Sequence, residues 1–204
     1  MNVPGASSVP AMLRNKLLSL EQYARERPAF RRRVIAHKKM RTVALGDHVV
    51  LQFEDALTVL YQIQEMLRIE RIFEEDGIHQ EIAAYAPLVP GGSNLKASML
   101  IGYDDALQRR QWLSRLVGVE HAVWLQVDGH APVHAIADED LPRSDALKTS
   151  AVHFLRFELT DEMRRALAAG AALSAGVDHA HYPARSGALP QAVRAALCAD
   201  LIPL

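Results

Sequence analysis

The stretch from Glu54 to Asp76 constrains the fold most, because it belongs to the longest run of the chain that lacks glycine and proline. On a helical wheel at about 100° per residue, its apolar side chains surround the axis instead of forming one stripe. We therefore expect one long, mostly buried central helix. Buried charge is unfavourable unless it is paired or bound. The polar residues inside this helix are thus the first place to look for function: Gln64, Glu65, Arg68 and Glu70.

The chain length and the turn signals predict the fold class. A chain of 204 residues, half of them apolar, suits one globular domain, which we place at residues 11–204 behind a flexible tail of residues 1–10. Turn signals at Gly46-Asp47 and Asp128-Gly129 indicate hairpins, which outnumber strand-helix-strand units. The sequence therefore predicts an α+β fold, with a mainly antiparallel sheet packed around or against the central helix.

Composition limits the chemistry and the compartment. The single cysteine, Cys198, excludes an internal disulfide framework and cysteine-rich metal sites, so that a metal would need histidine and carboxylate ligands. No apolar run approaches the roughly 18 residues of a membrane span, and the opening MNVPGASSVP lacks the features of a signal peptide. We expect a cytoplasmic protein without a membrane segment.

Common catalytic motifs are absent from the sequence. There is no G-x-G-x-x-G, P-loop, G-x-S-x-G, H-E-x-x-H or C-x-x-C pattern. This disfavours the familiar hydrolases, kinases and dinucleotide enzymes.

The predicted central helix supplies two candidate acids. Glu70 has apolar residues at helical-neighbour spacings, and Glu65 lies three residues before Arg68, a spacing that allows an ion pair. Two interpretations remain open. The acids either pair with nearby arginines as a structural network, or they bind a metal ion or substrate.

Two histidines lie at positions where the sequence pattern suggests a metal ligand. His153 falls on the apolar face of the strand expected at Ala151–Leu159, and His179 belongs to the Asp178-His179-Ala180-His181 run at a strand end. Histidine together with carboxylate suits Fe, Mn or Zn. The alternatives are a core histidine bonded to the backbone and a polar exit loop.

A basic run from Arg25 to Arg41 could dock an acidic partner. It contains eight Lys or Arg residues and one acid. Phe30 is its only aromatic residue, whereas proteins that bind single strands need several stacking platforms. With a net charge of -1 for the whole chain, nucleic acid is not the expected partner.

Several segments resemble a known bacterial family. They are RVIAHKKMR (33–41), YQIQEMLRIERIF (61–73), VPGGSNLKASM (89–99), SAVHFLRFELT (150–160) and AGVDHAHYP (175–183). In this order they resemble the family named domain of unknown function 3501, over about Leu18 to Leu201. That family has no established activity. The resemblance implies a redox or peroxide-defence context, since its genes lie near those of rubrerythrin-like and iron-sulfur proteins. The matching segments contain His37, Glu65, Arg68, Glu70, Asn94, His153 and His179.

Three hypotheses follow. The first is an accessory protein that binds Fe, Mn, Zn or a small redox ligand and interacts with a protein partner in a redox pathway. Its metal ligands would be His37, Glu65, Glu70, His153 and His179, and Arg68 and Asn94 would bind the ligand. The second is an interaction protein without chemistry of its own, docking an acidic partner through Arg31 to Lys39. The third is an enzyme that uses a buried glutamate and a histidine as acid and base. The sequence leaves the substrate and the oligomeric state open.

Overall fold

The computed structural model describes residues 8–203, and the chain divides into two compact units. Unit 1 comprises the chain up to Lys39 together with Glu54–Gly91; unit 2 comprises Met40–Phe53 together with the chain from Gly92 onward. The chain thus runs from unit 1 into unit 2, back into unit 1, and finally into unit 2 again. The predicted tail at residues 1–10 falls mostly on residues 1–7, outside the described part, and Ser8–Pro10 begin helix α1. The single domain proposed for residues 11–204 stays a prediction.

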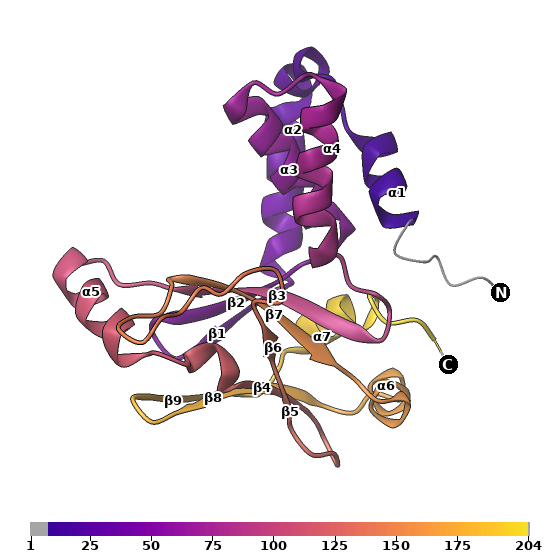
Figure 1. Ribbon diagram of the computed structural model, residues 1–204. Helices are drawn as coiled ribbons and strands as arrows, with labels where there is room; N and C mark the ends of the chain where they lie inside the picture. The colour runs from indigo at the N-terminus through magenta and orange to yellow at the C-terminus, as the bar shows by residue number, and fades with distance from the viewer. Residues whose placement is uncertain (1–7, 204) are drawn as a thin grey trace. The chain divides into compact units, whose positions relative to one another are not determined.

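Unit 1 is helical in its described part (Figure 1). Helix α3 packs against α1, α2 and α4. Their bounds are α1 Ser8–Lys16, α2 Leu20–Lys39, α3 Ala56–Glu70 and α4 Glu75–Tyr85, followed by the short 3-10 turn η1 Ala86–Leu88. The buried core between them consists of Leu13, Val59, Leu60, Ile63, Leu67, Ile82 and Ala86. Helix α2 runs through Pro28.

One long central helix from Glu54 to Asp76 is not confirmed. Asp55 caps the start of α3, accepting bonds from the amides of Leu57 and Thr58. The helix ends at Glu70 because Arg71 adopts a left-handed conformation (φ 56°), and its amide donates to the carbonyl of Leu67. The buried residues of α3 therefore belong to a helical core and not to a sheet that surrounds them.

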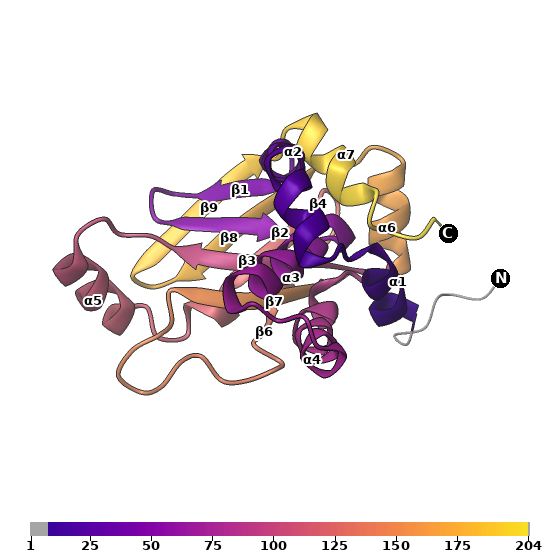
Figure 2. The same cartoon turned by 90° about the horizontal axis from the view of Figure 1, so that it is seen from above.

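Unit 2 contains, in its described residues, a five-stranded and a four-stranded sheet, both antiparallel (Figure 2). The first has the order β1-β2-β3-β7-β6 and the second β5-β4-β8-β9. The bounds are β1 Thr42–Leu45, β2 Val49–Phe53, β3 Asn94–Ile101, β4 Val123–Val127, β5 Val133–His134, β6 Ile136–Ala137, β7 Val152–Glu158, β8 Leu173–His179 and β9 Tyr182–Ala188. Together with the helices, these sheets confirm the predicted α+β class and its antiparallel pairing.

The two sheets enclose one core. Alternate residues of β3 and β7 are buried, as expected for strands with one face against a core. Residues of both sheets join one apolar cluster, which α6 (Asp161–Ala168) and α7 (Gln191–Cys198) complete with Leu167 and Leu197. Helix α5 (Ala106–Arg115) contributes no fully buried residue.

Strand β9 follows the Asp178–His181 run, which forms the end of β8 and the turn between the two strands and not a longer polar exit loop. Its burial alternates between partly buried and exposed positions, so its pattern carries little apolar signal. The Tyr182 hydroxyl accepts a bond from the amide of His48 at 2.8 Å and donates to the carbonyl of Leu45 at 2.8 Å. The strand is thereby tied to the turn between β1 and β2.

Candidate functional site

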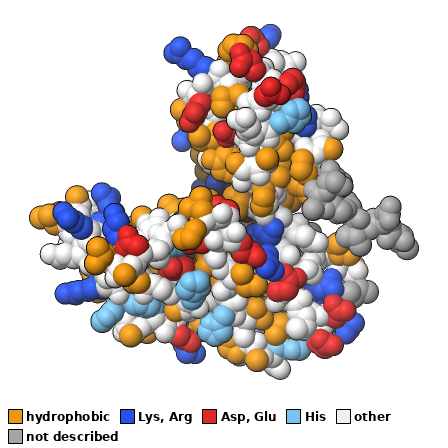
Figure 3. All heavy atoms as spheres, viewed as in Figure 1, with side chains coloured by type: hydrophobic (Ala, Val, Ile, Leu, Met, Phe, Trp, Pro, Cys, Tyr) orange, Lys and Arg blue, Asp and Glu red, His pale blue; other side chains and the backbone are white. Residues whose placement is uncertain are grey.

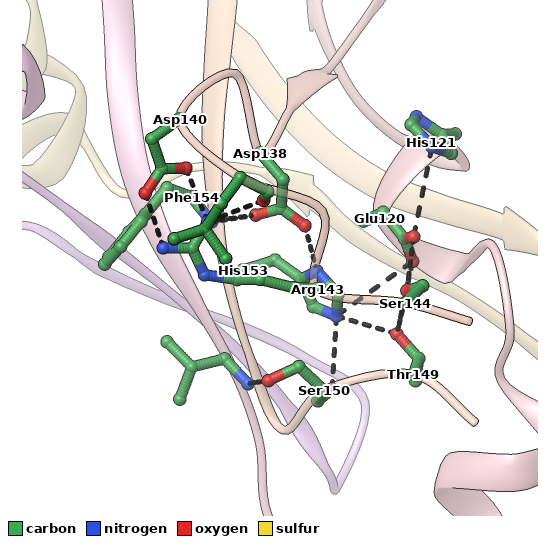
Figure 4. A network of polar contacts seen from close by, with 12 residues as sticks. Glu120, His121, Asp138, Asp140, Arg143, Ser144, Thr149, Ser150, His153 and Phe154 are labelled. Atoms are coloured by element: carbon green, nitrogen blue, oxygen red, sulfur yellow. Dashed lines mark hydrogen bonds and ion pairs between the residues drawn. The ribbon is translucent and has the colours of Figure 1, made fainter.

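Two carboxylates and one imidazole converge in unit 2 (Figure 4). Glu120 comes from the 3-10 turn η2 (Val119–His121) that precedes β4, Asp138 follows β6, and His153 lies near the start of β7. Their side chains are at most 8% exposed. In the part of the chain that the structure describes, this is the one group of three candidate metal-ligating side chains whose ligand atoms all lie within 4.8 Å of one another. The predicted inward register of His153 on its strand is confirmed.

The backbone of β7 holds Asp138 in place. Asp138 is one of two described non-glycine residues with positive φ (51°), a conformation that aspartate tolerates better than most residues. Its amide donates to the carbonyl of Phe154 at 2.8 Å, and its Oδ1 accepts the amide of Phe154 at 3.0 Å. Its Oδ2 lies 2.6 Å from Nδ1 of His153. Asp138 therefore fixes the orientation of the imidazole.

Two hydroxyl groups connect His153 to Glu120. Nε2 of His153 lies 2.8 Å from Oγ1 of Thr149, which lies 2.7 Å from Oγ of Ser144. Ser144 donates to Oε1 of Glu120 at 2.6 Å. A continuous hydrogen-bonded chain thus runs from Asp138 to Glu120 (Figure 4).

One backbone contact indicates where the hydrogens of this chain lie. Nε2 of His153 is 3.1 Å from the carbonyl of Ser150, and a carbonyl oxygen can only accept a hydrogen bond. Nε2 therefore carries a hydrogen in this arrangement. The hydroxyls of Thr149 and Ser144 can then both point toward Glu120.

Arg143 closes the site on the side of Asp138. Its guanidinium donates to Oδ1 of Asp138 at 3.2 Å and to both oxygens of Asp140, and it lies 4.4 Å from the ring centre of Phe154. The hydrogen bonds with Asp140 raise the pKa of Arg143 and lower that of Asp140. The positive charge of Arg143 thus compensates the negative charge of the nearly buried Asp138 carboxylate.

The donor set suits a metal ion in part. Two ligands of one ion are about 3 Å apart or more, so that Oδ2 of Asp138 and Nδ1 of His153, at 2.6 Å, cannot both bind it. Nε2 of His153 and Oε2 of Glu120 are 4.0 Å apart, which a small closure brings into ligand range. Asp138 then serves as the carboxylate that orients a metal-binding histidine.

The order carboxylate, imidazole, hydroxyl is also that of a nucleophilic triad. Here the hydroxyl belongs to Thr149, which is 2% exposed. At this exposure a substrate in solution cannot reach the hydroxyl. The geometry therefore gives no support to a hydrolase.

Glu65 lies in an ion-pair network of unit 1. Arg27 donates to both of its oxygens at 2.7 and 2.9 Å, Tyr23 donates through its hydroxyl at 2.5 Å, and Arg68 donates at 3.1 Å. The Arg27 hydrogen bonds hold the pKa of Glu65 at about 2, and burial with the Glu65 contact raises the pKa of Tyr23. The structural interpretation of Glu65 and Arg68 matches these contacts.

The other predicted metal ligands are scattered. His37 pairs with Asp55 at 2.5 Å in unit 1, and Glu70 is exposed, so its predicted burial is wrong. His179, in unit 2, lies 3.2 Å from the carbonyl of Val117. None of the three belongs to the group around His153.

The remaining candidates are also placed by their contacts. The amide of Asn94 donates to Glu158 at 3.3 Å, across the pairing of β3 with β7. In α2, Arg31, Arg32, Arg33 and Lys39 are exposed.

Sequence reasoning missed Glu120 and Asp138. A signal for Glu120 was present, since it is the only charged residue of an apolar run from Leu116 to Leu125 apart from His121. Asp138 offered none, because it reads as the first acid of an acidic loop.

Comparisons with known proteins identify the family. Residues 11–201 match the family described as Protein of unknown function (DUF3501). The chain belongs to this family. The resemblance seen in the sequence is thereby confirmed for this DUF3501 chain, and a comparison with curated proteins finds no match.

A similar crystal structure supports the fold. It is described as a novel protein of unknown function from Burkholderia pseudomallei K96243, with a TM-score of 0.89 and 58% sequence identity. The match covers 93% of this chain and 98% of that chain. No described helix of the DUF3501 chain is long and apolar enough to cross a membrane.

Proposed function

We propose that this protein binds one divalent transition-metal ion through His153 and Glu120, with Asp138 holding the imidazole ring. The observation that carries the proposal is the buried group of three ligand-type side chains within 4.8 Å. Of the five metal ligands expected from the sequence, only His153 is retained.

The chemistry of the donors supports Fe, Mn or Zn. A histidine nitrogen with carboxylate and hydroxyl oxygens is a mixed N and O set, which these ions accept. The ion would replace the hydrogen on Nε2 of His153 and lie between this nitrogen and Glu120. Iron or manganese would supply one-electron chemistry, in keeping with the redox context that we expect for an accessory protein of this family.

Metal content per chain tests the proposal. Protein purified without a histidine tag is measured by plasma mass spectrometry as isolated, and again after addition of Fe(II), Mn(II) or Zn(II) and desalting. We expect about one ion per chain in the wild type and loss of the ion in Glu120→Gln and His153→Gln. His134→Gln, at an exposed histidine of β5, is the matched control and should keep the ion.

Thermal unfolding gives a second readout. Both tryptophans, Trp112 and Trp124, lie in unit 2, so their fluorescence reports on the unit that contains the site. An ion at about 100 times its dissociation constant should stabilise the fold by about 2.7 kcal/mol, or roughly 5–10 °C for a chain of this size. A wild type that stays metal-free with an unchanged melting temperature refutes the proposal, as does unchanged metal content in Glu120→Gln.

A further inference from the structure

Helix α5 presents a basic groove at the surface of unit 2. Ala106, Arg109, Arg110 and Leu113 follow the i, i+3, i+4, i+7 spacing of one helix face. This face and the segment Asp145–Lys148 line a groove of about 670 Å³. Figure 3 shows Lys and Arg side chains beside hydrophobic ones on this part of the surface. The groove, called the α5 groove below, thus combines apolar and positively charged walls.

The arginines of the α5 groove have no carboxylate partner close by. Among the described residues no carboxylate oxygen lies within 4.0 Å of the side-chain nitrogens of Arg109 or Arg110, whereas Lys148 interacts electrostatically with Asp145. Asp145, the acid of the groove, accepts the amides of Leu147 and Lys148 at 2.7 and 2.9 Å and so shapes the turn. Leu147 is 79% exposed. The groove therefore offers the positive charge of Arg109 and Arg110 beside apolar surface, a combination that marks interaction sites.

Unit 1 carries a surface of the opposite character where α3 ends and α4 begins. Phe73 is 72% exposed and Ile69 is 59% exposed. The acids Glu70, Glu74 and Asp76 flank them along the chain and are exposed, as is Arg71. The left-handed Arg71 turns the chain between the two helices, so that Phe73 lies outside the helical core. The segment Ile69–Asp76, called the acidic corner below, is thus apolar with an acidic rim.

We propose that the acidic corner of one copy of this protein binds in the α5 groove of a second copy. Phe73 and Ile69 would bury their exposed apolar surface against Leu113 and Leu147. The rim acids would meet Arg109, Arg110 and Lys148. Each surface supplies what the other lacks, in both charge and apolar area.

The two surfaces differ, so the contact joins unlike patches. Such a contact either is exchanged reciprocally between two copies or continues from copy to copy as a larger ring or an open chain. Since charge complementarity sets the encounter, association should weaken as salt increases. The proposal does not depend on the metal site.

Analytical ultracentrifugation of the full chain tests the contact. We expect the weight-average mass of the wild type to rise between about 10 and about 500 µM at low salt, and to rise less at about 0.5 M salt. Arg109→Glu with Arg110→Glu should weaken association roughly tenfold or more. Phe73→Ser should weaken it as well, without a change of charge. Arg31→Glu with Arg32→Glu makes the same charge change on the exposed face of α2, and this matched control should associate like the wild type.

A charge swap provides the decisive outcome. Glu70→Lys with Glu74→Lys should associate roughly tenfold or more weakly than the wild type when alone, as should the Arg109→Glu, Arg110→Glu variant. A mixture of the two should associate again, because the unchanged corner of the groove variant meets the unchanged groove of the corner variant, and the lysine-bearing corner meets the glutamate-bearing groove. A wild type that is monomeric over the whole range overturns the proposal, as does a mixture of folded variants, checked by circular dichroism, that stays monomeric.

Discussion

Replacing Glu65 with glutamine should destabilise unit 1 at neutral pH and remove part of its sensitivity to acid. The carboxylate accepts hydrogen bonds from Arg27, Tyr23 and Arg68, and these keep its pKa at about 2, against an ordinary value of 4.5. Glutamine keeps the shape of the side chain but not its charge. The variant therefore tests the charge of Glu65 and not its packing.

The magnitude follows from the pKa. A drop from 4.5 to about 2 corresponds to about 3.4 kcal/mol of preferential stabilisation of the charged form. Arg27 is about one third exposed and solvent screens its charge, so we reduce the value to about 2 kcal/mol. Because the folded pKa lies below the unfolded one, this stability is present above pH 4.5 and is lost as the pH falls toward 2.

Hydrogen exchange of peptides from α2 and α3 measures the effect locally. At neutral pH the variant should exchange about 30-fold faster than the wild type, and the difference should shrink toward zero near pH 2. Glu70→Gln is the matched control on the same helix, and its exchange should equal that of the wild type because Glu70 is exposed. If Glu65→Gln exchanges like the wild type at neutral pH, Glu65 is not held by this network.

Two further substitutions test the packing of unit 2 by urea unfolding with tryptophan fluorescence. Asp200→Asn should destabilise the unit by about 3 kcal/mol, because Asp200 pairs with the buried guanidinium of Arg41. The control is Asp161→Asn, at an exposed aspartate. A loss of stability below about 1 kcal/mol in Asp200→Asn would contradict the reasoning. Gly176→Ala should lower the free energy of unfolding by about 2–3 kcal/mol, because the new Cβ would lie 2.2 Å from Cζ2 of Trp124. Gly102→Ala is the control, since its new Cβ meets no atom within 4 Å. Equal effects of the two substitutions would refute this account.

Local patterns predicted the elements of the fold well. The alternation of His153, Leu155 and Phe157 marks β7, and Gly46-Asp47 marks the turn between β1 and β2. The end of α3 was missed because Arg71 carries no sequence signal for a left-handed conformation. Apolar side chains on all sides of the helical wheel predict one long buried helix, but Ile69 and Phe73 are exposed in the structure.

The candidate site could be predicted only in part. His153 stands out in sequence because a histidine on an apolar strand face is unusual. Its partners depend on tertiary packing: Glu120 lies 33 residues earlier on another element, and Asp138 is placed by its bonds to the backbone of Phe154. Proximity in sequence favoured Glu65 with Arg68, and the structure places this pair in an arginine network.

The interrupted course of the chain has a consequence for its synthesis on the ribosome. All of unit 1 has been made once Gly91 is added. The β1–β2 hairpin has also been made by then, but its neighbouring strand β3 and Asp200, the ion-pair partner of Arg41, have not. At elongation rates of about 5–20 residues per second, the stretch from Gly92 to Asp200 takes roughly 10 s. During that interval the nascent hairpin exposes an unpaired edge and an apolar face. Unit 1 can therefore mature early, while unit 2 waits until Asp200 has been added.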